Sequence, residues 1–383
     1  MRQLDNQHAQ SLAAEHGTPL LAIDCHELAD RYAALKNALP GVDFYYAVKA
    51  FPNASVVNVL NSLGAGFDIA TSGELKLMRK LHINPRRCIH THPIKKDSEI
   101  RAALRFGATT FVVDNVAELE KFVPYRSRVG LLLRVSYRNP DAVVDLSKKF
   151  GCDLRNAPAI LERARELGIR VKGLSFHVGS QSATATAQAQ AVCACGDLIR
   201  AERLLGHSLD VLDIGGGFPV GYHGKPVEIE DFVRPLREAL DELPEGLEVI
   251  AEPGRYLVAS AVSGVFSVVG KANRGGQPWY YLDDGVYGSF SGIIYDHAHY
   301  PLRTVAPYQG DVQSSVVSGP TCDSIDVISE ALELPELAIG DLLVGEMMGA
   351  YTAASASEFN SLSKAKIISL NEEAYLSQVY YIA

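Results

Sequence analysis

The 383-residue sequence predicts a parallel (β/α)8 barrel of the TIM type together with a second, mostly β domain. The barrel is predicted because nearly continuous apolar segments alternate with amphipathic helical segments, and eight such units fit into about 210 residues. The β domain is predicted because β-branched and aromatic residues dominate after about residue 256, where long helical patterns become sparse. An open, doubly wound sheet is the alternative, and eight consecutive units favour closure.

Eight strands are predicted in the first domain, each as an apolar stretch bounded by turn residues. In chain order they are FYYAVK (44–49), GFDIA (66–70), RCIHTH (87–92), TTFVVD (109–114), VGLLLRV (129–135), VKGLSFHV (171–178), LDVLDIGG (209–216) and EVIAEPG (248–254). Helices are predicted between them, for example over 72–81, 98–107 and 156–168, the last of which ends in a glycine. We therefore expect the barrel to span 24–256.

The β domain is expected to combine residues 257–383 with residues 1–23. Segments such as WYYLDDGVYGSF and SSVVSGPTCDSIDVI have the composition of strands broken by Gly, Asn and Asp. The short run PLLAID (19–24) is predicted to add one strand to this domain, which makes the barrel an insertion.

Composition narrows the classes of function. The formal net charge of −9 disfavours a general nucleic-acid or anionic-membrane surface. No apolar run has the length of a membrane span, and the polar N-terminus lacks the apolar core of a secretory signal. The six cysteines are scattered without a paired CxxC framework, so neither a zinc site nor a disulfide framework is predicted. We expect a cytoplasmic protein with no nucleic-acid or membrane partner.

Polar residues stand at the carboxyl ends of the predicted strands, which is where TIM-barrel enzymes carry their chemistry. A single polar strand end is uninformative, because buried acids and bases often only pair with each other. Several that converge on one face indicate a site, and here they are Lys49, Asp68, Arg134, His177 with the following Gly179 and Ser180, the glycines 215–217, and EPGR (252–255).

Two of these features suggest a cofactor. Lys49 ends an apolar strand, so it is either a charge lifted into solvent or a desolvated amine that forms an imine with a carbonyl group. The glycines 215–217 allow backbone N–H groups to approach a phosphate, and Arg255 stands near them in the predicted fold. An aldehyde and a phosphate together indicate pyridoxal 5′-phosphate. The turn IGGGFP is not a GxGxxG dinucleotide motif.

These residues lie in longer stretches that resemble fold-type III pyridoxal-phosphate decarboxylases, which have the alanine-racemase-like fold. Within that group the sequence is most similar to ornithine decarboxylases and lysine/ornithine decarboxylases. The resemblance extends from about residue 44 to 360. The matching stretches are YYAVKAFPN, GFDIATSGEL, SFHVGSQS, LDIGGGFP, AEPGRYLVASA, DDGVYGSFSGIIYDHAH, GPTCDSIDVI and MGAYTAASASEFN.

The resemblance implies how the cofactor is bound. Lys49 would hold it covalently through its aldehyde, His177 would stack on the pyridine ring, and Glu252 would pair with the pyridine nitrogen. A carboxylate there favours the protonated nitrogen and therefore a strong electron sink. The phosphate would be bound by Ser180, Gly215, Gly216, Gly217, Gly254, Arg255 and Tyr351, with Asp68 and Arg134 as supporting residues.

The resemblance also implies a homodimer with shared active sites. Cys322 and Asp323 would enter the active site of the partner subunit, Cys322 to protonate the carbanion carbon and Asp323 to bind the substrate. Tyr295 and Asp296 would act on the subunit that holds the cofactor, so that Asp296 and Asp323 neutralise the distal ammonium of a diamino acid. Phe359 would line the pocket.

Related activities of the same fold fit less well. In alanine racemase an Arg faces the pyridine nitrogen and a Tyr is the second base, whereas this chain has Glu252 and Cys322. Diaminopimelate decarboxylase must bind a distal carboxylate, which the acids of YDHA and CDS do not suit. Arginine and carboxyspermidine decarboxylases are longer or differ around these acids. A cofactor-carrying or regulatory binding protein is the non-enzyme alternative, and the retained Lys49, Glu252, Cys322 and Asp323 argue against it.

The implied reaction is the decarboxylation of a basic L-diamino acid, first of all L-ornithine to putrescine and CO₂. Lysine, giving cadaverine, or both substrates remain open, because one methylene discriminates by only ~1–3 kcal/mol in a pocket. Polyamine biosynthesis is the expected pathway, and another diamino acid of a siderophore or antibiotic pathway is a further alternative.

Overall fold

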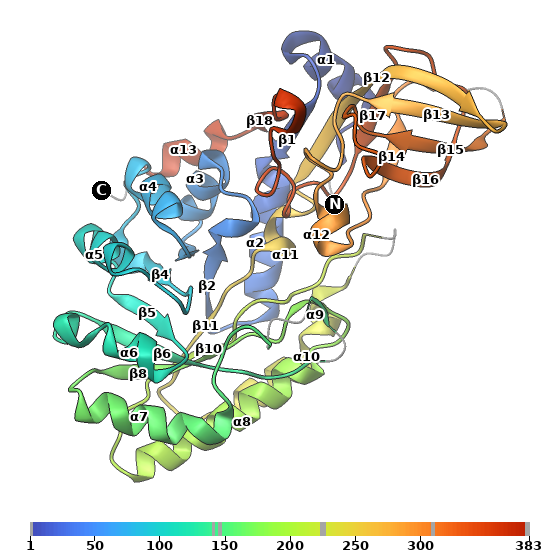
Figure 1. The fold of residues 1–383 in the computed structure, drawn as a ribbon. Coiled ribbons are helices and arrows are strands. Elements are labelled where there is room, and N and C mark those ends of the chain that lie inside the picture. The colour runs from blue at the N-terminus through green and yellow to red at the C-terminus, as the bar shows by residue number, and fades with distance from the viewer. Residues whose placement is uncertain (1–2, 140–141, 145–147, 223–226, 308–310, 380–383) are drawn as a thin grey trace. The chain divides into compact units, whose positions relative to one another are not determined.

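A computed structural model describes residues 3–139, 142–144, 148–222, 227–307 and 311–379 (Figure 1). The chain forms two compact units. The barrel unit comprises Arg31–Val220 and Val227–Tyr256, and the β unit comprises Met1–Asp30, Gly221–Pro226 and Leu257–Ala383.

The barrel unit contains a closed ring of eight parallel strands, in the spatial order β10-β11-β2-β3-β4-β5-β6-β8. This result confirms the predicted barrel and excludes the open sheet. Each predicted strand overlaps one strand of the ring: β2 (Val42–Ala47), β3 (Gly66–Ile69), β4 (Cys88–His90), β5 (Thr110–Val113), β6 (Gly130–Val135), β8 (Val171–Phe176), β10 (Val211–Asp213) and β11 (Glu248–Ala251).

One apolar cluster in the barrel unit draws one residue from each of several strands of the ring. Ile89, Val112, Leu132, Val211 and Ile250 are buried together, and Tyr45 packs against them. Each comes from a different strand, which is why every strand reads as an apolar run in the sequence.

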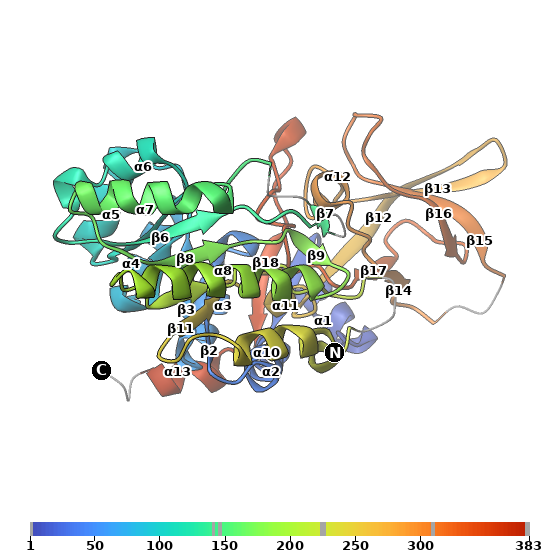
Figure 2. The same cartoon turned by 90° about the horizontal axis from the view of Figure 1, so that it is seen from below.

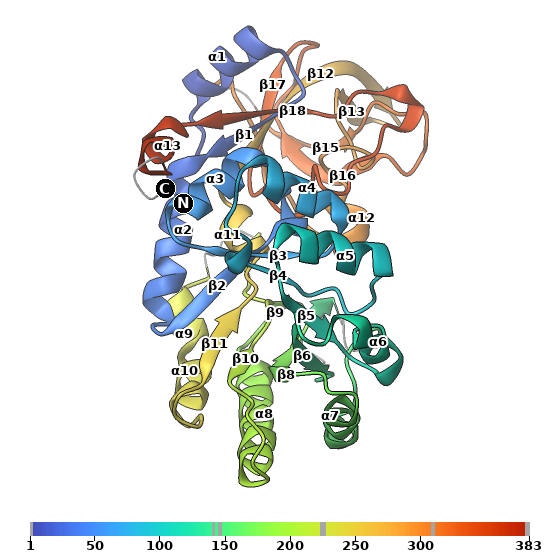
Figure 3. The ribbon, with the colours of Figure 1, turned by 90° about the vertical axis from the view of Figure 1, so that its left-hand side faces the viewer.

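Helices connect the strands and cover the outside of the ring (Figures 1 and 3). Several begin at a residue whose side chain caps the first turn: Asn53, Thr71 and Asn115 accept hydrogen bonds from the backbone N–H groups of Ser55, Glu74 and Glu118. The helices are α3 (Ala54–Ser62), α4 (Ser72–Lys80), α5 (Asp97–Phe106), α6 (Val116–Glu120), α7 (Ala157–Glu166), α8 (Thr186–Leu204), α9 (Ile229–Phe232) and α10 (Arg234–Asp241). Figure 2 shows α8 and α10 side by side.

Short elements complete the barrel unit. Four 3₁₀ turns are described in it: η1 (Val48–Ala50), η2 (Pro85–Arg87), η3 (Val123–Tyr125) and η4 (Leu154–Asn156). A small antiparallel pair, β7 (Ala142–Val144) with β9 (Ser180–Ser182), was not predicted, because three-residue strands are too short to carry a periodic signal. The helices α2 (Cys25–Ala38) and α11 (Arg255–Val258) lie where the chain passes from one unit to the other.

The β unit is built on an eight-stranded sheet within the described residues. Its main path is β14-β17-β12-β13-β15-β16, and β1 pairs with both β12 and β18. The run at 19–24 thus forms strand β1, as predicted. The strands are β1 (Leu20–Asp24), β12 (Val262–Arg274), β13 (Gln277–Leu282), β14 (Leu302–Thr304), β15 (Gln313–Ser318), β16 (Val327–Leu334), β17 (Leu342–Gly345) and β18 (Lys366–Leu370).

The β unit also carries four short helical elements. They are α1 (Asn6–His16), α12 (Gly292–Asp296), α13 (Glu373–Val379) and the 3₁₀ turn η5 (Phe359–Ser361). Its core cluster joins Leu20 and Ala22 of β1 to Val265 of β12 and Val344 of β17. Across the part of the chain that the structure describes, no helix is both long and apolar enough to span a membrane.

Candidate active site

Lys49 lies in a turn and not, as predicted, at the end of a strand. Strand β2 ends at Ala47, and the chain then forms the 3₁₀ turn η1, which the hydrogen bond from Phe51 N to Val48 O closes at 3.2 Å. The Lys49 ammonium is 2.7 Å from a carboxylate oxygen of Asp68 in β3. The Asp68 side chain is 1% exposed and that of Lys49 42% exposed, so a buried acid holds an amine that remains accessible.

The second oxygen of Asp68 accepts a hydrogen bond from the Thr91 hydroxyl. Asp68 is thereby fixed between β3 and the loop after β4. A fixed acid gives the Lys49 amine a defined position, which a flexible lysine on a surface strand does not have.

The glycine turn after β10 packs backbone against backbone. Gly215 has φ +67°, and a Cβ atom there would lie 2.3 Å from the Phe176 carbonyl oxygen. At Gly216 a Cβ would lie 2.7 Å from the Glu252 carbonyl oxygen and 3.1 Å from His177 Nε2. No side chain fits at either position, so the turn leaves a backbone surface suited to an anion.

Gly217 continues the same turn, and a Cβ there would lie 2.6 Å from the Gly179 carbonyl oxygen. Close by, Arg255 Nε donates to the Ser180 hydroxyl at 3.4 Å, and Arg255 is buried. Gly254 lies against Ala47 and Ala50, since its Cβ would come within 3.2 Å of both methyl groups. Backbone amides, a hydroxyl and a guanidinium are the groups that bind a phosphate, and the predicted phosphate residues of the barrel unit meet here.

His177 directly follows β8 and has a defined tautomer. Its Nδ1 accepts a hydrogen bond from Gly179 N at 3.0 Å, which puts the proton of the neutral ring on Nε2. Burial lowers the pKa of His177 well below its ordinary value, and the positive charges of Arg134 and Lys49 act in the same direction. His177 as a residue is half-buried, and its neutral ring is of the kind that stacks on another aromatic ring.

Glu252 directly follows β11 and is buried. Burial raises its pKa well above the ordinary value, as do the charges of Asp213 and Asp68, while Lys49 opposes the shift. The Glu252 backbone N donates to the Gly215 carbonyl at 2.8 Å, which joins this residue to the glycine turn. Arg134, in β6, places its guanidinium 5.5 Å from the centre of the Phe150 ring.

Asp213, the last residue of β10, is a site residue that the sequence reasoning missed. It is fully buried, and its Oδ1 accepts a hydrogen bond from Gly215 N at 2.9 Å. Its carboxyl group also neighbours that of Glu252. The signal that selects Asp68, an acid near the carboxyl end of an apolar strand, applies equally to Asp213.

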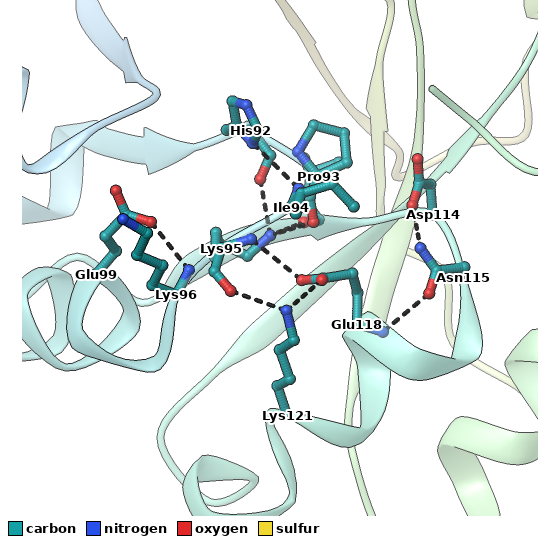
Figure 4. A network of polar contacts seen from close by, with 11 residues as sticks. His92, Pro93, Ile94, Lys95, Lys96, Glu99, Asp114, Asn115, Glu118 and Lys121 are labelled. Carbon is teal, nitrogen blue, oxygen red and sulfur yellow. Dashed lines mark hydrogen bonds and ion pairs between the residues drawn. The ribbon is translucent and has the colours of Figure 1, made fainter. Parts of the chain in front are cut away.

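A network around Lys95 supports the rim of the barrel at β4 and β5 (Figure 4). Lys95 is buried, and its Nζ donates to the carbonyl oxygens of His92, Pro93 and Val112 at 2.7, 2.8 and 2.6 Å. Burial lowers the pKa of Lys95 to about 7, yet three carbonyls match the three N–H bonds of an ammonium. Glu118 accepts a hydrogen bond from the Lys95 backbone N at 3.2 Å.

In the β unit, Cys322 and Asp323 lie on the loop between β15 and β16, where Cys322 is exposed and Asp323 is half-buried. The amide oxygen of Asn360 lies 3.1 Å from Cys322 N and 3.3 Å from Cys322 Sγ, and both groups donate to it. Asp323 accepts a hydrogen bond from the Tyr287 hydroxyl at 2.5 Å, which lowers the pKa of Asp323 and raises that of Tyr287 to about 12.

Neighbouring residues of the β unit hold this loop in place. The rings of Tyr287 and Phe359 stack with centroids 4.3 Å apart. The buried carboxylate of Asp326 accepts from Val286 N at 2.8 Å and from the backbone N and hydroxyl of Thr321 at 3.0 and 2.7 Å. Tyr287 and Asn360 are therefore two further residues that sequence reasoning did not single out.

The other predicted residues of the β unit lie on separate segments. Tyr295 and Asp296 end α12, where Tyr295 is 67% exposed. Tyr351 has φ +55°, and its carbonyl oxygen accepts a hydrogen bond from the Ser355 hydroxyl at 2.8 Å. The contacts of the β unit thus connect Cys322, Asp323 and Phe359 through Tyr287 and Asn360.

Comparisons with known proteins give one consistent result. Residues 25–259 match the pyridoxal-binding domain of the pyridoxal-dependent decarboxylases. The lysine/ornithine decarboxylase of Selenomonas ruminantium is 35% identical over 372 residues, which cover 97% of this chain and 94% of that protein. Antizyme inhibitor 2 of Xenopus laevis is 35% identical over 384 residues, with 96% of this chain and 83% of that protein covered.

A solved structure gives a higher identity. The lysine/ornithine decarboxylase of Vibrio vulnificus, complexed with putrescine, is 48% identical and superposes with a TM-score of 0.92. The match covers 97% of this chain and 99% of that structure.

Proposed function

The chain belongs to the family of pyridoxal-dependent decarboxylases, and we propose that it decarboxylates a basic L-diamino acid, first of all L-ornithine, to give putrescine and CO₂. The observation that carries the proposal is the arrangement of side chains and backbone at the mouth of the barrel unit. There an accessible amine is held by a buried acid, beside a glycine turn with a guanidinium and a hydroxyl. These groups fit the aldehyde and the phosphate of pyridoxal 5′-phosphate.

Each residue of the barrel unit has a role that its contacts support. Lys49 binds the cofactor covalently through Nζ, with Asp68 fixing the amine. The glycines 215–217, Gly254, Ser180 and Arg255 bind the phosphate, and the neutral His177 ring stacks on the pyridine. Glu252 holds a proton at the pyridine nitrogen, and Arg134 supports the site. When bound, pyridoxal phosphate supplies the electron sink that accepts the bonding pair released with CO₂.

The residues of the β unit act on the substrate. Cys322 delivers a proton from Sγ to the α-carbon, with the thiol positioned by Asn360. Asp323, held by Tyr287, and Asp296 bind the distal ammonium of the substrate. Phe359 and Tyr295 line the substrate pocket, and Tyr351 contributes to the phosphate site.

We further propose a two-fold homodimer with two shared sites, in which Cys322 and Asp323 serve the site of the partner subunit. The exposure of Cys322 on a loop of the β unit, with Asp323 next to it, supports this assignment. A putrescine product would place the reaction in polyamine biosynthesis, and we expect a cytoplasmic protein.

A second candidate is a dual lysine/ornithine decarboxylase. The relatives from Selenomonas ruminantium and Vibrio vulnificus carry that name, and this is the observation that supports the second candidate. The match to antizyme inhibitor 2 raises the non-enzyme alternative, and the retained Lys49, Glu252 and Cys322 argue against it.

The test is a comparison of kcat/KM for L-ornithine, L-lysine, L-arginine and meso-diaminopimelate, with CO₂ and the amine product both measured. We expect L-ornithine to give the highest kcat/KM, with L-lysine second by a factor of about 10 to 100, as one methylene allows. Equal values for the two would establish the dual enzyme. Preference for L-arginine or meso-diaminopimelate would overturn the substrate assignment.

A further inference from the structure

Two acidic side chains meet at the base of the candidate site. Asp213 ends β10 and Glu252 follows β11, and these strands pair in parallel with Asp213 opposite Ile250. Gly215 connects the two acids, since its N–H donates to Asp213 Oδ1 at 2.9 Å and its carbonyl accepts from Glu252 N at 2.8 Å. Asp213 is 0% exposed and Glu252 8%, so neither has substantial contact with water.

The second carboxylate oxygen of Asp213 lacks a hydrogen-bond donor unless one of the two acids carries a proton. Asp213 Oδ2 is buried, and no donor among the described residues reaches it. Its neighbour is the Glu252 carboxyl group. Two ionised carboxylates are both acceptors and repel each other strongly away from water, whereas one shared proton turns the contact into a hydrogen bond.

The charged groups around Asp213 and Glu252 do not remove the need for a proton between the two carboxyl groups. Asp68 from β3 adds a third negative charge, while Lys49 from η1 and Arg134 from β6 are positive. Lys49 is already paired with Asp68 at 2.7 Å, and His177 after β8 is neutral. The Tyr45 hydroxyl of β2, whose pKa burial raises to about 12, is also uncharged.

We propose that Asp213 is a positioning residue for Glu252, and that the two carboxyl groups share one proton over the working pH range. Asp213, held by Gly215, thereby fixes the orientation of the Glu252 carboxyl group. The consequence for cofactor binding rests on the proposed function, in which Glu252 faces the pyridine nitrogen. The shared proton itself is a property of the folded chain and does not depend on that function.

The pair has a defined effect on stability against pH. Burial raises the pKa of Asp213 to about 6 and that of Glu252 well above its usual range. In the unfolded chain both acids lose their protons near their ordinary pKa values of about 4. Above about pH 6 the folded pair thus holds one more proton than the same two acids in the unfolded chain, and the folding equilibrium constant falls about tenfold per pH unit from this source.

The experiment is urea unfolding of the full-length protein, freed of cofactor, at several values between pH 6 and 8. The variants are D213N, E252Q and the double variant, with D43N on the exposed side of β2 as the matched control. If the two acids share one proton, D213N and E252Q should each remove the same tenfold change in the folding equilibrium constant per pH unit. The double variant should then remove no more than either single variant. D43N should keep the wild-type slope. Additive slopes in the double variant, or a wild-type slope in D213N, would overturn the shared proton.

A second measurement tests whether Asp213 positions the Glu252 carboxyl group. An Asn at 213 can accept from Gly215 N with its oxygen and donate to Glu252 with its NH₂ group, whereas Ala can do neither. We expect D213A to weaken the binding of pyridoxal 5′-phosphate by about tenfold or more, and D213N to bind it nearly as well as the wild type. Equal losses in the two variants would refute the positioning role. If the wild type itself failed to bind the cofactor, the proposed function would fail while the unfolding result still stood.

Discussion

The most sharply defined structural prediction concerns Lys95, whose ammonium joins the loop after β4 to strand β5. Replacement by Met keeps the length of the side chain but removes the donors to three carbonyl oxygens, of His92, Pro93 and Val112. A buried polar group left without a partner costs about 1–3 kcal/mol. Three such groups therefore cost roughly 3–9 kcal/mol, from which the desolvation cost of the buried ammonium must be subtracted.

We expect K95M to lower the free energy of unfolding of the barrel unit by about 3 kcal/mol at pH 6, with K96M at the neighbouring exposed position as the control within about 0.5 kcal/mol. The assay can separate the two units, because the single tryptophan, Trp279, lies in β13 of the β unit. Far-UV circular dichroism, which reports the many helices of the barrel unit, should show the shift. Tryptophan fluorescence should show a smaller one.

The same lysine gives a pH dependence with a definite sign. Burial lowers its pKa from 10.5 to about 7, so above pH 7 the folded protein binds fewer protons at this position than the unfolded chain. Raising the pH from 7 to 9 should therefore stabilise the wild type relative to K95M. A loss below about 1 kcal/mol in K95M, or a stability difference that shrinks as the pH rises, would refute the reasoning about this network.

Three further predictions concern the site. Ala at Gly216 would place a Cβ 2.7 Å from the Glu252 carbonyl oxygen, so G216A should weaken cofactor binding and cost about 1–3 kcal/mol of stability. The control G73A, whose Cβ would make only ordinary contacts, should do neither. A G216A variant with wild-type stability and cofactor binding would contradict the close packing. An equal mixture of K49A and C322A subunits should regain about a quarter of wild-type activity after subunit exchange, because half of the dimers then hold one intact site out of two. No recovery of activity after verified exchange would exclude shared sites. D296N should raise the KM for L-ornithine about tenfold or more by removing a charge partner of the distal ammonium; unchanged kinetics would exclude Asp296 from the pocket.

The barrel was predictable from the sequence because strands that are buried on both faces appear as continuous apolar runs. The ends of these strands were less predictable. The predicted seventh strand, 209–216, is longer than β10, which ends at Asp213 because the following glycines leave the ladder to form the turn. Lys49 also lies outside the ladder, because β2 ends at Ala47 and the 3₁₀ turn η1 begins at Val48.

The residues that the sequence did not reveal depend on contacts between distant segments. Tyr287 and Asp323 form a hydrogen bond although they are 36 positions apart in the sequence, and Asn360 and Cys322 do so at a separation of 38 positions. Lys95 stands in the polar stretch IKKD and has the pattern of a surface lysine, but the carbonyl of Val112 helps to bury it. Asp213 differs, because the rule that selected Asp68 would have found it.

Lys49 and its neighbours, we infer, make this chain a decarboxylase of a basic diamino acid. The most direct measurement is the release of CO₂ and putrescine from L-ornithine by the purified protein loaded with pyridoxal 5′-phosphate, beside K49A treated in the same way. We expect equal amounts of the two products from the wild type and at least about a thousandfold less from K49A, because a nucleophile is removed. Bound cofactor without CO₂ release from L-ornithine or L-lysine would contradict this inference.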